Sequence, residues 1–68
     1  MEWEDAVKFC EEIISVCHDV PEKGEEFAFS VMTTVESMKK NIEEFKNCTK
    51  NQLKALKNMD EGISRWIK

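Results

Sequence analysis

Asn47-Cys48-Thr49-Lys50-Asn51-Gln52-Leu53, residues 47–53, is the stretch that decides how many helices the chain forms. Thr49 and Gln52 have the spacing of a capping box, in which each side chain accepts a hydrogen bond from the other residue's backbone N–H. Cys48 and Leu53 occupy the two positions of a hydrophobic staple. Because the stretch also opens with three weak helix formers, we predict that one helix ends before Thr49 and that another begins there.

Apolar residues on both sides of this stretch recur at steps of three and four, as in a helix with one apolar face. The pattern predicts three helices, from about Glu2 to Val20, from about Glu25 to Lys46, and from Thr49 to the end of the chain. The apolar positions are Trp3, Ala6, Cys10, Ile13, Cys17 and Val20 in the first, Ala28, Val31, Val35, Met38, Ile42 and Phe45 in the second, and Leu53, Leu56, Met59, Ile63, Trp66 and Ile67 in the third.

Pro21 and Gly24 separate the first two segments, and a connection this short predicts antiparallel neighbours. We therefore predict a single all-α domain over residues 1–68, a small antiparallel three-helix bundle. The alternative is a helical hairpin with one long second helix, which would outreach the first helix and would have to dimerise. The predicted core of the bundle consists of Trp3, Val31, Val35, Met38, Ile42, Leu56, Ile63 and Trp66.

The first segment is apolar over about half of its circumference, because four further apolar residues flank its seam. A helix of this kind contacts two neighbours, or one neighbour and a second chain. Phe9 and Val16 lie at the margin of that face, and Phe29 lies away from the seam of its own segment. We take Phe9, Val16 and Phe29 as partner-binding candidates, and Phe9 and Val16 as the contact of a weak homodimer.

The chain of 68 residues is acidic, with 10 Lys and Arg against 14 Asp and Glu and a net charge of −4. The charge is uneven, since residues 1–26 carry a net −7 and residues 27–68 a net +3. Apolar runs are far too short to span a membrane, and the acidic start is unlike a secretory signal. These features predict a cytoplasmic protein that makes no use of a membrane.

A basic strip runs along the third segment, where five cationic side chains project within about 80° of one another. A strip of this kind is a solvated face or a contact for phosphates or for an acidic partner. The acidity of the first segment opposes nucleic-acid binding, because it repels the same phosphates. The strip consists of Lys50, Lys54, Lys57, Arg65 and Lys68.

The residue pattern predicts no catalytic, cofactor or metal site. Cys10, Cys17 and Cys48 lack the paired spacing of a zinc site, and His18 is the only histidine. Adjacent residues on a helix point about 100° apart, so Cys17 and His18 do not form a nucleophilic pair. We expect reduced thiols that behave as small apolar side chains, and a protein that is not an enzyme.

The stretch TKNQLKALKNMDEGISRW, from Thr49 to Trp66, resembles a pattern in small uncharacterised bacterial and phage proteins, in which Thr-x-x-Gln-x-x-Ala-Leu opens a terminal helix. The resemblance covers about a quarter of the chain. It implies a helix start at Thr49 and a phage or mobile-element context, and it carries over no functional residue. The matching positions are Thr49, Gln52, Ala55, Leu56, Asn58, Met59, Gly62 and Trp66.

These observations favour a small intracellular protein-binding module, an adaptor or an inhibitor, that presents a helix face to an unknown protein partner. The second hypothesis is a nucleic-acid-associated accessory protein that uses the basic strip. The third is a purely structural homo-oligomer. None of the three requires a cofactor.

Overall fold

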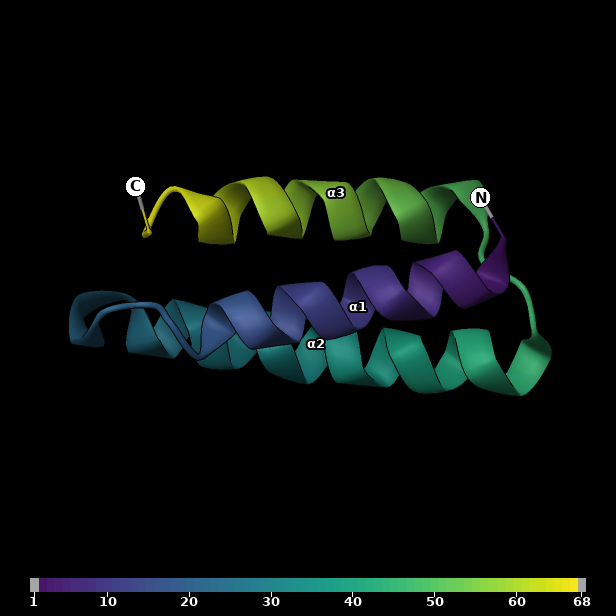
Figure 1. Ribbon diagram of the computed structural model, residues 1–68, viewed down its shortest axis with the longest axis horizontal. Helices are drawn as coiled ribbons and strands as arrows, with labels where there is room; N and C mark the ends of the chain where they lie inside the picture. The colour runs from purple at the N-terminus through teal and green to yellow at the C-terminus, as the bar shows by residue number, and fades with distance from the viewer. Residues whose placement is uncertain (1, 68) are drawn as a thin grey trace.

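The computed structural model describes residues 2–67, which fold into three helices joined by short connections. The helices are α1 (Trp3–Cys17), α2 (Glu25–Phe45) and α3 (Lys50–Ser64), and a single 3₁₀ turn, η1 (Glu22–Gly24), precedes α2. Figure 1 shows that α2 runs antiparallel to α1 and that α3 runs in the same direction as α1. The predicted all-α three-helix bundle is confirmed, with consecutive helices antiparallel.

The break at Thr49 is also confirmed, because both hydrogen bonds of the capping box are present. The backbone N–H of Gln52 donates to Thr49 Oγ1 at 3.1 Å, and the backbone N–H of Thr49 donates to Gln52 Oε1 at 2.9 Å. The long-second-helix alternative is therefore wrong. Lys46 lies just past α2 in the left-handed conformation, and the next amide, that of Asn47, bonds back to the carbonyl of Ile42 at 3.3 Å. This backbone reversal turns the chain before α3 begins.

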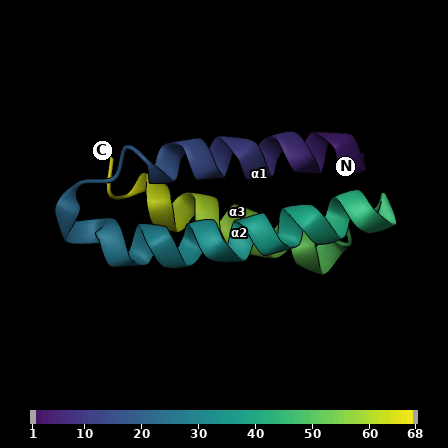
Figure 2. The ribbon, with the colours of Figure 1, turned by 90° about the horizontal axis from the view of Figure 1, so that it is seen from below.

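Helix α1 packs against both α2 and α3, whereas the contact between α2 and α3 is smaller. Figure 2 shows the bundle from below, with α3 behind α2. The expectation that α1 needs two neighbours is met within one chain. The buried core draws on all three helices and consists of Ala6, Cys10, Ile13, Cys17, Ala28, Val31, Val35, Ile42, Leu56 and Ile63.

The predicted core is correct at its centre and wrong at Trp66. Trp3 and Met38 are half-buried at its edge. Trp66 follows the end of α3 at Ser64 and is 39% exposed, with its ring close to Gly24. Phe45, expected in the seam of α2, is 70% exposed. It closes a helix of 21 residues that outreaches its 15-residue neighbours by about 9 Å.

We predict that Thr49→Ala lowers the free energy of unfolding by about 0.5–2 kcal/mol, because the amide of Gln52 loses its hydrogen-bond acceptor. The matched control is Thr33→Ala, in the middle of α2, where the hydroxyl bonds only to the carbonyl of Phe29 in its own helix. Alanine there should be neutral or stabilising. Chemical denaturation followed by circular dichroism measures both, and a rise in the Thr49→Ala midpoint would contradict the assignment of the cap.

Candidate functional site

Two aromatic rings pack on the two glycines where the start of α2 meets the end of α3. A Cβ atom added at Gly24 would lie only 2.7 Å from Trp66 Cδ2, so the indole needs a glycine beneath it. A Cβ added at Gly62 would lie 3.1 Å from Cζ of Phe27. Both rings are held by this packing and still expose a large part of their surface to solvent.

The same end of the bundle carries a hollow of about 420 Å³, lined by Phe27, Gly62, Arg65 and Trp66. We call these four residues the end patch. Phe27 is 41% exposed, and Ile67, next to Trp66 in the chain, is 45% exposed. The hollow therefore offers two aromatic walls beside one guanidinium group, a combination that suits an apolar side chain with an adjacent carboxylate.

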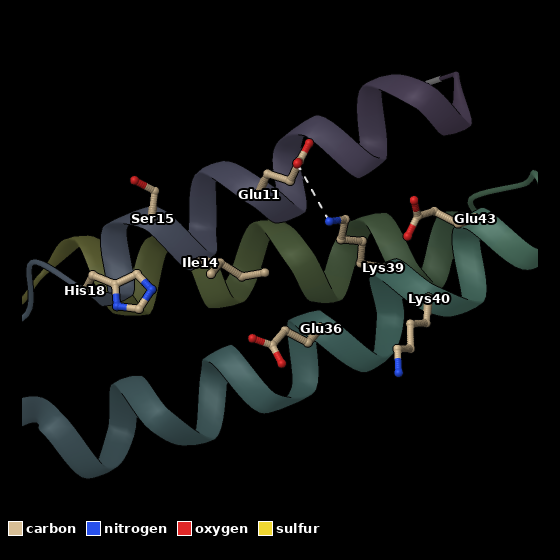
Figure 3. Close-up of a pocket in the computed structure, with 8 residues that line it drawn as sticks. All are labelled: Glu11, Ile14, Ser15, His18, Glu36, Lys39, Lys40 and Glu43. Carbon is tan, nitrogen blue, oxygen red and sulfur yellow. Dashed lines mark ion pairs between the residues drawn. The ribbon is translucent and has the colours of Figure 1, made fainter.

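A larger groove of about 610 Å³ lies between α1 and α2 (Figure 3). Ile14 points into the space between the two helices, and charged side chains of both signs surround it. Lys39 Nζ lies 3.7 Å from Glu11 Oε2, and this is the one ion pair among residues 2–67. With its charges mixed in this way, the groove selects neither an anion nor a cation. Its lining consists of Glu11, Ile14, Ser15, His18, Glu36, Lys39, Lys40 and Glu43.

His18 is exposed beside this groove, whereas Cys17, its neighbour in the chain, is buried in the core. The two side chains therefore occupy different environments and do not form a reacting pair. Within the described part of the chain, no three His, Cys, Asp or Glu side chains come together as a metal site.

The three partner-binding candidates do not form one surface. Phe9 and Val16 are half-buried and pack against the core. The Ile14 edge of α1 borders α2, and Phe9 and Val16 lie about 140–160° around the helix from it, on the side toward α3. Phe29 is 66% exposed and lines hollows with the end of α1 and with η1. Those hollows contain neither Phe9 nor Val16.

The basic strip divides into two parts. Lys50, Lys54 and Lys57 are exposed and line one hollow of about 330 Å³, in which Glu61 is the only acid. Arg65 belongs instead to the end patch. Lys68 lies outside the described residues. The strip is thus a three-lysine cluster on α3, separate from the arginine at the helix end.

The sequence did not predict the end patch, because it placed Trp66 in the core and Arg65 in the basic strip. A signal was present, since the chain has just two glycines and the structure places an aromatic ring on each. Which aromatic residue meets which glycine depends on how α3 packs on α2, and local sequence does not contain that information.

The thiols lie inside the fold, with Cys10 and Cys17 buried and Cys48 half-buried, and all three are free. Burial raises the pKa of the Cys10 thiol to about 11 and also raises the pKa of Cys17. Both therefore stay protonated at neutral pH, and the thiolate, not the thiol, is the reactive form. Cys10 and Cys17 act as small apolar residues of the core.

Comparison with family models, curated proteins and solved structures finds no match to this chain. Among residues 2–67, no helix combines the length and the apolar composition that crossing a bilayer requires. The site is therefore judged on its own geometry.

We predict that stability falls at alkaline pH because of Cys10. Its pKa is about 9.0 when unfolded and about 11 when folded, so the folded state holds the proton more tightly. The resulting stabilisation is complete below pH 9 and disappears as the pH rises through 11, a loss of at most about 2–3 kcal/mol. Urea denaturation across this range should show a smaller decline in Cys10→Ala than in the parent chain. Equal slopes would contradict the prediction.

Proposed function

We propose that this chain is a small protein-binding module, an adaptor or an inhibitor, that binds its partner through the end patch and has no chemistry of its own. The observation that carries the proposal is the exposure of Phe27 and Trp66 around one hollow with Arg65 at its border. Tryptophan and arginine are enriched among the residues that dominate protein–protein binding energies.

The packing of the end patch also supports the proposal. Because Phe27 and Trp66 rest on glycines, they are positioned before a partner arrives, and less side-chain freedom is lost on binding. An apolar side chain of the partner would enter the hollow, and a carboxylate next to it would meet Arg65. The partner is therefore expected to present an apolar residue flanked by an acidic one.

We predict that Phe27→Ser reduces capture of the partner from native cells at least about tenfold, because one aromatic wall of the hollow is lost. The matched control is Phe45→Ser, the same change on the same helix at a residue that is 70% exposed and outside the end patch. Immobilised parent and variant chains are compared by quantitative mass spectrometry of the bound proteins, after their melting curves show that each is folded. Equal loss in both variants, or in neither, would contradict the end patch as the contact.

A nucleic-acid-associated accessory protein is the second candidate, favoured by Lys50, Lys54 and Lys57 around one hollow with no ion pair among the described residues. Against it stands the acidic α1, which packs directly beside α3 and repels the same phosphates.

We predict that labelled duplex and single-stranded oligonucleotides show no binding at physiological salt, as measured by fluorescence anisotropy. If all five residues of the basic strip contacted duplex phosphates, the logarithm of affinity would fall with the logarithm of salt concentration at a slope near −4.5. Low-micromolar binding with a steep salt dependence, lost in Lys50→Glu/Lys54→Glu, would favour the second candidate over the first.

A further inference from the structure

The outer surfaces of α1 and α3 form one face of the bundle. The two helices pack side by side, start at the same end of the molecule and run in the same direction, and each has 15 residues (Figure 1). Their seam lies on the side of the bundle away from α2. We call this surface the α1–α3 face.

The floor of this face is half-exposed and mainly apolar, with Asp60 as a half-buried acid about 20° from Leu53 around α3. Phe9 and Val16 lie on the side of α1 toward α3 and are only partly buried. On α3, Gly62 marks the edge next to α2, and Leu53 lies about 180° around the helix from it, so Leu53 is on the side toward α1. Leu53 is also half-buried. A strip of apolar surface therefore remains in contact with water along the seam.

Opposite charges border the seam on its two sides. Asp5 and Glu12 are exposed on α1, seven residues apart, and Lys50 and Lys57 are exposed on α3 at the same spacing of about 10.5 Å. We call these pairs the acidic row and the basic row. None of the four makes an ion pair within the described chain.

Each of the two helices also carries one exposed residue whose charge is opposite to that of its own row. Lys8 is further around α1 on the side away from the seam, and Glu61 shares the surface of the basic row on α3. The acidic row and the basic row still keep their own sign at the matched seven-residue spacing.

We propose that a second copy of this chain covers the α1–α3 face, related to the first by a two-fold axis parallel to the helices. This axis lays the acidic row of each copy over the basic row of the other and brings the two apolar seams together. A two-fold axis across the helices would instead place acid on acid and base on base. The rows therefore select one of the two simple symmetric arrangements.

The axial positions of the rows fit this arrangement. Asp5 and Lys50 both lie in the first turn of their helices, which start at the same end of the bundle. Glu12 and Lys57 each follow seven residues later. Because the axis is parallel to the helices, it leaves axial positions unchanged, and both pairs form twice in the dimer.

The area of the face sets the strength of the dimer. The molecule measures 35 by 17 by 16 Å, so a long face covers roughly 600 Å², or about 1,200 Å² for two copies. That total is at the lower limit of specific interfaces, and the dimer is therefore weak and concentration-dependent. The accessible surface of the chain, 4954 Å², also exceeds by about 500 Å² the value typical of a folded monomer of 8.0 kDa.

The test uses two charge reversals, Glu12→Lys and Lys57→Glu, measured by sedimentation equilibrium up to high micromolar concentration. Each variant alone should dimerise at least about tenfold more weakly than the parent chain, because like charges meet twice across the two-fold axis. An equimolar mixture of the two variants should associate again, because its heterodimer has an opposite charge at both contacts. Only pairing between copies produces this recovery, and it fades with added salt.

The matched control is Lys40→Glu, which makes the same charge change at an exposed residue of α2 beside the α1–α2 groove. It should associate as the parent does, and melting curves show that every variant is folded. A parent chain that stays monomeric at every concentration would overturn the proposal and leave the α1–α3 face to a different protein. A mixture that associates no better than its two components would overturn the two-fold arrangement.

Discussion

The wide apolar face of α1 is the constraint on which the rest of the structure depends. A helix with one neighbour needs a narrow stripe, and α1 has apolar residues over about half of its circumference. A second neighbour must come either from the same chain or from another one. The reversal at Lys46 and the capping box at Thr49 supply it from the same chain, because they fold α3 back along α1 instead of extending α2. The end patch and the α1–α3 face both result from this placement of α3.

Local sequence was sufficient for the helices and for the break between α2 and α3. The capping box and the residues around Pro21 act through neighbours in the chain, and steps of three and four identify a helix without knowledge of its partner. The centre of the core was predictable for the same reason, as Val35, Ile42 and Leu56 illustrate.

The end patch and the position of Phe9 depend on tertiary packing, which explains why the sequence did not predict them. Trp66 continues the apolar periodicity of α3 in the sequence, yet its ring rests on Gly24, more than forty residues earlier in the chain. Phe9 is at the margin of an apolar face whether α3 lies beside it or not. Only the placement of α3 shows that this margin borders a seam.

The core contains no polar side chain among the residues that the structure describes. Valine, isoleucine, leucine, alanine and cysteine pack without directional bonds, so such a core favours burial and not one particular alignment of the helices. The glycine–aromatic contacts provide that alignment. If α3 slid along α2 by one turn, Trp66 would meet a residue with a Cβ instead of Gly24, and Phe27 would leave Gly62. The two glycines therefore leave the space that the aromatic rings need and so set the register of α3 on α2. Hydrogen-bonded polar groups perform this role in many other cores.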